Sequence, residues 1–387
     1  MSHILIDRIA GATRLALTSA GRLEDFSLAV DSRPSLLDGL YLARVTDVIP
    51  SISAAFLDLG GAPAMLNFRH DPPVVGALMI VQVAADAHGD KDARVVDHVA
   101  LEGRFTVLRP MASGITISQA IRDRGDRARL EAALPKDIKG GITVRSRAAG
   151  LLADGRLDVM TADLARLAVL WAGALEAAER RDTPGCLVPA PTAMERAIGN
   201  WADEDTEIIC ADAALLKPVA DALAAHAPDL ALHPHFDAQP GLFARFGIED
   251  ELATLTEPVL ALTGGGHISI YETPALTAVD VDSGSARSWA PDQTAEGVNA
   301  VAAEAVARQL RLRHIGGTVV VDFVGFEAQS HAALEHLRAA LAGDPLASRP
   351  VGVSGHGLAI LTRRRLGPSL GEHYAALRHE PSGDQDE

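Results

Sequence analysis

The sequence predicts a mixed α/β protein built from several domains. Three observations support this prediction. Short apolar runs recur between turn residues in the first third of the chain, as in a small antiparallel barrel. Apolar residues at helical spacing dominate the middle of the chain. From residue 259 onward, strand and helix patterns alternate, which is typical of an α/β layer with its own core.

The first 110 residues contain two groups of predicted strands. Residues 3–8, 13–17 and 23–30 form the first group, with Gly11 at the first turn, and predict a small sheet. The second group lies between residues 36 and 110, where Gly, Pro, Asp and His separate apolar runs at 40–48, 53–59, 64–68, 78–84 and 105–108. Strands this short and this regularly spaced favour a compact antiparallel barrel.

The middle of the chain is predicted to be largely helical. Residues 120–134 and 161–181 have helical patterns, and a strand is expected at 140–145. The apolar stripe of the second helix is interpreted as a packing face formed by Leu164, Leu167, Ala168, Trp171 and Leu175. The proline-bearing stretch 183–191 marks a domain boundary, and a mixed α/β segment follows to about residue 256.

The last third of the chain predicts a sheet with covering helices. Strands are expected from residue 259, at 267–271, 276–281 and 318–324 and near 350 and 358, with helices at about 294–313 and 330–342. The three glycines 264–266 are interpreted as a tight turn between the first two strands. The final residues, PSGDQDE, predict a solvated tail.

Composition excludes several classes of protein. A chain of 387 residues that is 48% hydrophobic is neither disordered nor collagenous. Neither Cys186 nor Cys210 has a CxxC partner or a ligand-spaced His, so no disulfide framework and no zinc site are expected. No secretion signal and no long apolar segment are seen, which predicts a cytoplasmic protein without a membrane partner. The net charge of −16 means that any nucleic-acid site must be local.

Two aspartates interrupt strands that otherwise read as buried. Asp280 lies in TAVDVDSG and Asp322 in TVVVDFVG, and the two strands are expected to be neighbours in one sheet. Carboxylate oxygens without nearby His or Cys suit Mg²⁺, held together with water and a substrate phosphate. Asp282, two residues after Asp280, points to the same face if the strand continues. The alternative interpretation is that these are ordinary strand-end or turn aspartates.

Two groups of basic residues are candidates for binding a polyanion. The predicted helix before the Asp322 strand ends with Arg308, Arg311, Arg313 and His314, for which a solvated helix end is the alternative interpretation. The second group is a basic segment at 102–147, which carries ten basic and five acidic residues. A local excess of positive charge in an acidic chain is a plausible phosphate-binding surface.

These motifs resemble the ribonuclease E/G family over nearly the whole chain. The most specific match is ARQLRLRHIGGTVVVDF, supported by LTGGGHISIYETPALTAVDVDSG and GLAILTRRRLGPSLGE; ARVTDVIPSISAAFLDLGGAPAML and KGGITVRSRAAG match more loosely. The resemblance implies an OB-fold barrel inserted in a divided RNase H-like domain, a 5′-sensor region and a DNase I-like catalytic domain. The implied boundaries are RNase H-like parts at 1–35 and 190–258, the OB-fold at 36–110, the 5′ sensor at 111–189, the catalytic domain at 259–372 and a flexible tail at 373–387.

The resemblance also implies roles for individual residues. Asp280 and Asp322 match the two aspartates that bind the catalytic Mg²⁺, and Asp282 stands where the family usually has asparagine. Arg145 and Ser146 match a pair that binds the 5′-monophosphate of the substrate. The residues expected to contact RNA are Phe56, Lys91, Arg308, Arg311 and Arg313.

The sequence departs from the family pattern at several positions. Gly325 replaces a further aspartate, Gly355 replaces an arginine, and Met65 replaces a second aromatic of the OB-fold. Gln119 and Ala120 stand in place of an arginine pair. The family's zinc-link motif CPxCxGxG is absent, so no zinc is expected, and a homo-oligomer would not form through such a link.

The expected function is that of a Mg²⁺-dependent endoribonuclease specific for single-stranded RNA, with Mn²⁺ as a possible substitute ion. It would leave 5′-phosphate and 3′-hydroxyl ends, would favour 5′-monophosphorylated RNA, and would act in RNA processing or decay. Two alternatives stay open. One is an RNA-binding homologue with weak or no nuclease activity, suggested by the acidity and by Gly325 and Gly355. The other is a metal-dependent phosphatase or DNA nuclease that uses the same carboxylates.

Overall fold

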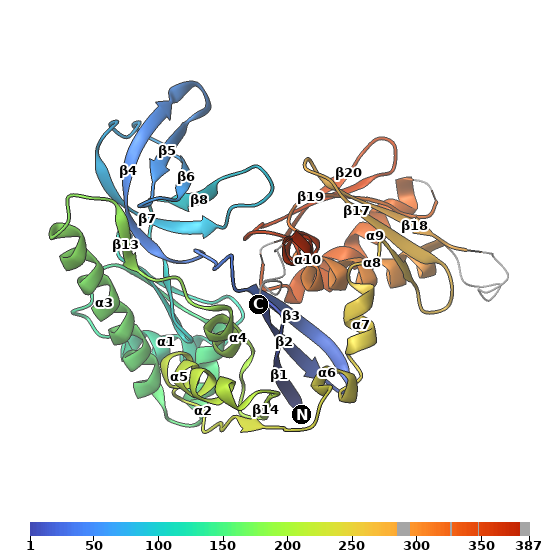
Figure 1. The fold of residues 1–387 in the computed structure, drawn as a ribbon, viewed down its shortest axis with the longest axis horizontal. Helices are drawn as coiled ribbons and strands as arrows, with labels where there is room; N and C mark the ends of the chain where they lie inside the picture. Colours follow the sequence, from blue (N-terminus) through green and yellow to red (C-terminus); the bar gives the residue numbers. More distant parts are fainter. Residues whose placement is uncertain (285–294, 326, 347, 380–387) are drawn as a thin grey trace, which may run out of the picture. The chain divides into compact units, whose positions relative to one another are not determined.

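The computed structural model describes residues 1–284, 295–325, 327–346 and 348–379. Contacts between Cα atoms divide the chain into two compact units (Figure 1), one formed by Met1–Asp31 with Asp237–Glu387 and the other by Ser32–Phe236. These units are coarser than the predicted domains, whose boundaries stay predictions. The predicted mixed α/β class is confirmed.

A closed barrel forms the first part of the unit Ser32–Phe236. Its strands are β4 (Leu40–Ile49), β5 (Ala54–Asp58), β6 (Pro63–Asn67), β7 (Leu78–Ala85) and β8 (Ala93–Val96), with the short helix η1 (Pro50–Ile52) after β4. They run in the order β4-β5-β6-β8-β7, and antiparallel pairing of β4 with β7 closes the barrel. Alternate residues such as Ala55, Leu57, Ala64 and Leu66 point into its core. The compact barrel predicted from the short apolar runs is therefore confirmed, and it is OB-like. Two details differ from the prediction: β6 and β8 pair in parallel, and the run at 105–108 lies outside the barrel, in β10 (Thr106–Arg109) of a second sheet.

The rest of this unit surrounds a second small sheet. Its strand order is β11-β12-β10-β9, with β9 (Leu101–Glu102), β10 (Thr106–Arg109), β11 (Ile115–Ile117) and β12 (Gly141–Val144). The helices packed on it are α1 (Arg124–Ala133), η2 (Ser146–Ala149), α2 (Gly150–Ala153) and α3 (Leu157–Glu179). The chain then continues through β13 (Gly185–Val188), α4 (Ala193–Trp201), β14 (Thr206–Cys210), η3 (Ala213–Leu215), α5 (Leu216–His226) and β15 (His235–Phe236).

The packing face predicted for α3 is correct except at its last member. Leu164 and Leu167 are buried, but Leu175 is 40% exposed and Ala174 is buried in its place. At 100° per residue, positions 174 and 175 lie about equally far from the middle of the stripe through Leu164 and Leu167, so the periodicity alone does not decide which of the two is buried.

The other unit begins with three antiparallel strands, as predicted. They are β1 (Ser2–Ile9), β2 (Ala12–Ser19) and β3 (Arg22–Val30), and the turn from β1 to β2 uses Gly11 at a φ of +74°. The short helices α6 (Leu242–Arg245) and α7 (Glu249–Thr254) belong to the same unit.

A six-stranded sheet with two covering helices completes this unit. Its order is β16-β17-β18-β19-β21-β20, with β16 (Val259–Ala261), β17 (His267–Glu272), β18 (Thr277–Asp282), β19 (Gly317–Asp322), β20 (Ser348–Val353) and β21 (Ala359–Arg363). Helices α8 (Ala295–Leu312) and α9 (Glu327–Ala340) pack on one face of the sheet (Figure 1), and η4 (Leu341–Gly343) follows α9. The alternating pattern predicted from residue 259 is confirmed.

The C-terminal segment differs from the predicted tail. Residues 373–379 belong to helix α10 (Leu370–His379), which a capping box formed by Ser369 and Glu372 starts. Residues 380–387 lie outside the described residues.

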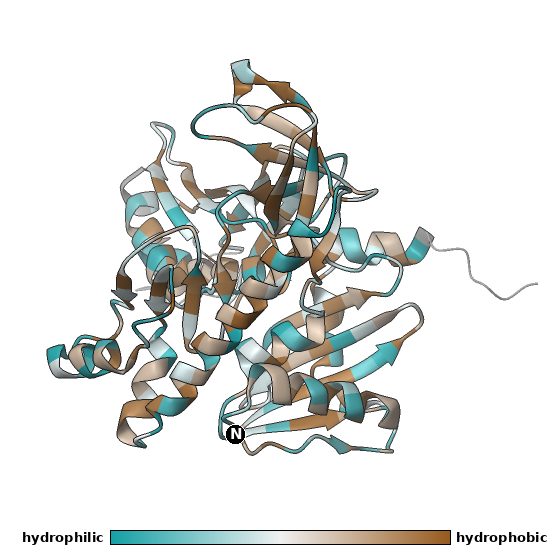
Figure 2. Ribbon diagram, turned by 90° about the vertical axis from the view of Figure 1, so that its left-hand side faces the viewer, coloured by the Kyte–Doolittle hydropathy of each residue, from teal (hydrophilic) through white to brown (hydrophobic). Residues whose placement is uncertain are grey.

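Along the strands and helices, hydrophobic and hydrophilic residues are interspersed (Figure 2). Among the described residues, no helix combines the length and apolar character that a membrane crossing requires.

Candidate functional site

Asp280 and Asp322 lie side by side on neighbouring strands. β18 and β19 pair in parallel, and the register places Asp280 directly opposite Asp322. Paired strands lie about 4.8 Å apart, so carboxylates carried at these two opposite positions are close enough to share one ion. Both residues are exposed. The convergence expected from the sequence is therefore present in the backbone register.

Alternation along the strands forces both carboxylates to one face. Val279 and Val281 of β18 and Val319 and Val321 of β19 are buried against α8 and α9. Successive side chains of a strand point to opposite faces, so the aspartates between and after these valines must face away from the helices. Hydrophobic burial of the valines thus holds the acidic pair on the face opposite α8 and α9.

Asp282 lies on the same face but is partly engaged in a turn. It is the last residue of β18, and its Oδ1 accepts a hydrogen bond of 2.6 Å from the Gly284 N–H. One carboxylate oxygen is therefore used locally, as in an Asx turn. The other oxygen stays available for a bound ion or its water.

The donor set fits a hard cation that keeps several water molecules. Within the described ranges, no group of three or more His, Cys, Asp or Glu side chains has the arrangement of a complete metal site. Mg²⁺ in proteins is nevertheless usually held by only one or two carboxylates, because water and substrate phosphates complete its octahedral coordination. Two carboxylates on paired strands match this number. The residues present therefore fit Mg²⁺ better than an ion that needs an all-protein cage.

Two residues next to the pair shape the backbone after Asp322. Gly325 has a φ of +108°, a conformation that favours glycine. Asn299 of α8 bonds the backbone of Val324, one residue before the glycine. Sequence reasoning missed Asn299, although a polar residue within an apolar helix face was a usable signal.

Arg145 lies at the wall of a cavity of about 400 Å³ in the unit Ser32–Phe236. Its Nη1 donates a 2.8 Å hydrogen bond to the Gly103 carbonyl and lies 3.5 Å from Glu102 Oε2. Ser146 is exposed at the start of η2, directly after Arg145. Arg166, Arg196 and His226 also line the cavity, and burial lowers the pKa of His226, which disfavours the charged form of its imidazole.

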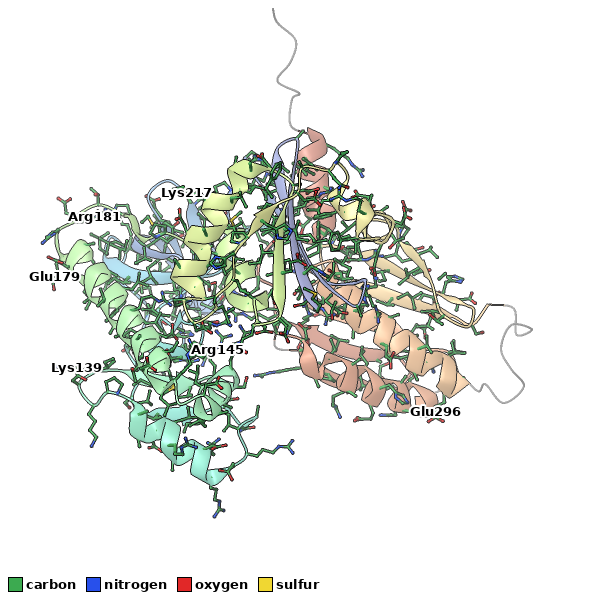
Figure 3. All side chains as sticks on the ribbon, turned by 90° about the horizontal axis from the view of Figure 1, so that it is seen from below. Lys139, Arg145, Glu179, Arg181, Lys217 and Glu296 are labelled. Carbon is green, nitrogen blue, oxygen red and sulfur yellow. The ribbon has the colours of Figure 1, made fainter. Side chains whose placement is uncertain are left out.

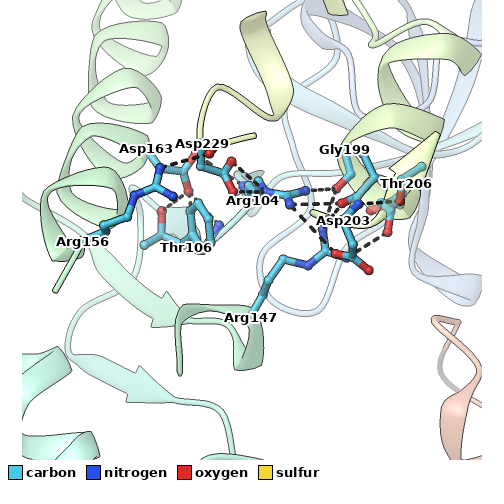
Figure 4. A network of polar contacts seen from close by, with 12 residues as sticks. Arg104, Thr106, Arg147, Arg156, Asp163, Gly199, Asp203, Thr206 and Asp229 are labelled. Atoms are coloured by element: carbon cyan, nitrogen blue, oxygen red, sulfur yellow. Dashed lines mark hydrogen bonds and ion pairs between the residues drawn. The ribbon is translucent and has the colours of Figure 1, made fainter. Parts of the chain in front are cut away.

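A polar network holds the strand end that carries the Gly103 carbonyl (Figure 4). The carboxylate of Asp163 accepts hydrogen bonds from the backbone N–H groups of residues 104, 105 and 106 and from the Thr106 hydroxyl. Gly103 must be glycine, because a Cβ there would lie 2.3 Å from Asp163 Oδ2. The Arg104 guanidinium is 4% exposed and pairs with Asp229 at 2.9 Å. The acceptor for Arg145 is thus rigidly placed.

The basic segment at 102–147 is less available to a phosphate than its sequence suggests. Many of its arginines bind protein groups: Arg104 binds Asp229, Arg109 binds Thr143, Arg127 binds carbonyls of residues 117, 118 and 121, Arg129 binds Asp126, Arg145 binds Glu102 and Arg147 binds Asp203. Burial lowers the pKa of Arg147, and the nearby positive charge of Arg104 lowers it further. The segment therefore does not form one continuous cationic surface.

The barrel carries a row of side chains on its outer face. Phe56 pairs with Met65 across β5 and β6, and Met65 pairs with Arg94 across β6 and β8. Phe56 and Met65 are half-buried and Arg94 is exposed. Lys91 is exposed in the turn before β8, where it bridges to His88. Arg94 was missed from the sequence, although its place between the core residues Ala93 and Val95 predicts an outward side chain.

The three arginines at the end of α8 bind protein groups. Arg308 pairs with Glu251 at 2.6 Å, and Arg311 donates a 3.0 Å bond to the Glu24 carbonyl. Arg313 is 4% exposed and donates to Gln309 Oε1 at 2.7 Å. These contacts join α8 to β3 and α7. Binding of RNA by the three residues stays a prediction, and we leave them out of the proposed site.

Comparison with known proteins adds a second, independent observation. The model of the ribonuclease E/G family matches residues 100–366, a range that contains Arg145 and both strands of the aspartate pair. The chain belongs to the ribonuclease E/G family. The resemblance seen in the sequence motifs is thereby confirmed.

Several curated relatives in this family align with most of the chain. Ribonuclease G of Escherichia coli (strain K12) is 28% identical over 404 residues, covering 96% of this chain and 81% of the relative. Ribonuclease G of Haemophilus influenzae is 27% identical, with the same coverage of 96% and 81%. Ribonuclease E of Nostoc sp. is 30% identical over 361 residues, which cover 87% of this chain and 52% of that relative.

Proposed function

We propose that this member of the ribonuclease E/G family is a Mg²⁺-dependent endoribonuclease that cleaves single-stranded RNA. The observation that carries the proposal is the register of Asp280 opposite Asp322, on the sheet face that α8 and α9 do not cover. Membership of the family and relatives named ribonuclease G and ribonuclease E support an RNA substrate and a role in RNA processing.

The chemistry follows from what the two carboxylates do. Asp280 and Asp322 each offer an oxygen toward the space between them, and Asp282 offers its second oxygen from the same face. A bound Mg²⁺ supplies Lewis-acid polarisation of the scissile phosphate and a water of lowered pKa. Asp280 and Asp322 would hold that ion in a fixed place. Attack of water on the phosphorus, in line with the 3′ oxygen as leaving group, would then produce 5′-phosphate and 3′-hydroxyl ends. Mn²⁺, also an oxygen-liganded cation, is expected to substitute.

The barrel supplies a surface for a single strand. Phe56 offers an aromatic face for base stacking, worth about 1–3 kcal/mol per base, and Met65 extends the apolar area beside it. Arg94, next in the row, offers a charge to the backbone, and Lys91 a second one. Stacking tolerates every base, so this surface favours single strands without a strict sequence preference.

The 5′ end of the RNA is proposed to bind at the cavity wall. Arg145 offers a guanidinium and Ser146 a hydroxyl, which together suit a terminal monophosphate. Because one end of the Arg145 guanidinium already bonds Gly103, the group is held in place before any ligand arrives.

A cleavage assay tests the proposed function. Purified chain is incubated with a 5′-monophosphorylated, AU-rich single strand, with and without Mg²⁺, and the ends of the products are analysed. We expect Mg²⁺-dependent cleavage that leaves 5′-phosphate ends. Binding without cleavage across several divalent metals and pH values would instead establish the RNA-binding alternative. Activity on DNA or small phosphoesters would establish a metal-dependent DNA nuclease or phosphatase.

Substitution Glu102→Ala should increase the preference for 5′-monophosphorylated RNA. The Glu102 carboxylate lies 3.5 Å from Arg145 Nη1 and competes with an incoming phosphate for the same cation. Exposed pairs of this kind are worth about 0.2–1 kcal/mol, so the ratio of kcat/KM for monophosphorylated over hydroxyl-ended RNA should rise by a factor between about 1.4 and 5.

Glu179→Ala is the matched control for that experiment. It removes the same charge from the same unit, and Figure 3 shows Glu179 at the end of α3, away from Arg145. An equal rise of the ratio in both variants would mean that only the net charge matters and would contradict a competition at Arg145.

Substitution Arg94→Ala should weaken RNA binding and reduce its salt dependence. If the guanidinium contacts one phosphate, the slope of log K against log salt concentration should fall by about 0.7 for a single strand. Fluorescence anisotropy of a labelled single strand at several salt concentrations measures this slope. Lys217→Ala removes an exposed cation on α5 and serves as control; a slope unchanged in Arg94→Ala relative to it would remove Arg94 from the RNA path.

A further inference from the structure

Asn299 is a fully buried polar residue beside the candidate metal ligands. Its side chain is 0% exposed and it lies near the start of α8, on the helix face that packs against the sheet. Its neighbours on this face include Val298, Ala302 and Ala303, which belong to the hydrophobic core. A carboxamide in such surroundings is unfavourable unless its polar atoms are satisfied.

Both polar atoms of Asn299 bind one residue, Val324. The Nδ2 amide donates a 2.8 Å hydrogen bond to the Val324 carbonyl, and the Val324 N–H donates a 3.0 Å bond to Oδ1. A carboxamide is the side-chain group that offers a donor and an acceptor side by side, so it can bind the N–H and C=O of the same residue. Asn299 therefore acts as a two-point clamp on this short piece of backbone.

The clamp begins where the β-ladder ends. Pairing of β19 with β21 runs to Val321 opposite Ala359, while the pairing with β18 includes Asp322. Asp322 is thus the last residue of its strand, and the chain turns at Gly325 with a φ of +108°. Between the strand end and this turn, the Asn299 side chain holds the backbone.

We propose that Asn299 is a positioning residue for the Asp322 carboxylate. By fixing Val324, it limits how the backbone can rotate directly after Asp322 and so keeps that carboxylate aimed at the ion it shares with Asp280. This inference rests on the proposed metal site. Removing groups that orient metal ligands typically lowers metal affinity by about 10- to 100-fold, which sets the expected effect.

Two substitutions separate positioning from simple packing. Asn299→Asp keeps the size and the acceptor for the Val324 N–H, but it places a second acceptor against the Val324 carbonyl. Asn299→Ala removes both bonds. Both variants should weaken binding of Mn²⁺, used as the probe ion, by about 10- to 100-fold relative to the unaltered chain. Titration of the full chain with Mn²⁺, followed by the paramagnetic resonance signal of the free ion, measures this affinity without any RNA.

The chain offers a matched control in Gln82 of the barrel. Its Nε2 donates to the Ala100 carbonyl at 3.0 Å, and the Ala100 N–H donates to its Oε1 at 2.8 Å, so it forms the same kind of clamp in the other unit. Gln82→Ala removes both of these buried hydrogen bonds, so it should lower the stability of the fold. It should leave the affinity for Mn²⁺ unchanged. Asp322→Asn provides the reference for a lost ligand.

The outcomes distinguish the inference from the function on which it rests. If the folded Asn299 variants bind Mn²⁺ as tightly as the unaltered chain, the positioning role is wrong while the metal site stands. If the unaltered chain itself shows no Mn²⁺ binding that depends on Asp322, both the metal site and the positioning role are overturned. Near-UV circular dichroism establishes that each variant is folded.

If neither Asn299 variant folds, hydrogen exchange of the unaltered chain tests the proposal instead. Bound Mg²⁺ should slow hydrogen exchange in peptides that span residues 319–325, because the ion and the clamp restrain the same backbone. Exchange in these peptides that does not change with Mg²⁺ contradicts the proposal.

Discussion

Replacing Asp322 or Asp280 by Asn should reduce Mg²⁺-dependent RNA cleavage by at least about 100-fold. A divalent ion contributes several kcal/mol of transition-state stabilisation, and a loss of about 3 kcal/mol already corresponds to this factor. Each substitution keeps size and one oxygen but removes the charge that binds the ion. Both side chains are exposed, so the free energy of unfolding should change by no more than about 0.5 kcal/mol. Single-turnover cleavage at saturating RNA measures the chemical step.

Asp282→Asn is the matched control for this prediction. Its carboxylate lies on the same face, but one oxygen already accepts the Gly284 N–H, and asparagine can accept that bond equally well. We therefore expect a far smaller loss than in the other two variants. Equal losses in all three would indicate that general negative charge matters here. Full activity in both Asp280→Asn and Asp322→Asn would remove the carboxylate pair from the mechanism.

Breaking the buried ion pair between Arg363 and Asp344 should destabilise the six-stranded sheet by about 3–5 kcal/mol. Arg363 Nε lies 2.6 Å from Asp344 Oδ2, and the two side chains are 2% and 3% exposed. A second bond of 3.0 Å joins Nη2 to Oδ1, and Nη1 donates to the Ile315 carbonyl at 2.7 Å. Asp344→Asn leaves the Arg363 charge buried without its counter-ion. Urea unfolding, with hydrogen exchange of β19 and β21 as the local probe, measures the loss.

The double variant Arg363→Met/Asp344→Leu separates the cost of an unpaired charge from the value of the pair. Apolar side chains of similar volume often restore the stability of a buried ion pair, so most of the loss should be recovered. A double variant as unstable as Asp344→Asn would show that the bond to the Ile315 carbonyl, which only the double variant removes, matters as much as the unpaired charge.

The candidate metal-binding aspartates could be predicted from the sequence because the pattern that places them is local. Asp280 and Asp322 each interrupt a valine-rich strand, and alternation along a strand places both on one face. One predicted helix lies between their two strands, and a helix that connects two strands commonly joins parallel neighbours in one sheet. The clamp by Asn299 was not predicted, because nothing in the helix pattern tells which backbone group a buried amide will meet.

Contacts between residues far apart in the sequence explain why the environment of several arginines could not be predicted from the sequence. Arg308 and Arg311 read as free cations at a helix end, yet they bind groups on α7 and β3. The basic segment at 102–147 read as a surface with an excess of charge, yet Arg104 is buried against Asp229. Sequence position reports the charge of a side chain but not the partner that folding brings to it.

By itself, the sequence determined the strands and helices, the barrel, the family and the shared face of the two aspartates. These depend on periodicity within short segments and on motifs, both of which are readable along the chain. Only the tertiary structure decided which arginines keep a free charge, that Glu102 stands beside Arg145, and that Asn299 holds the backbone after Asp322. These depend on pairs of groups brought together from distant positions, because the energy of a charge or a buried amide is set by its neighbours in space.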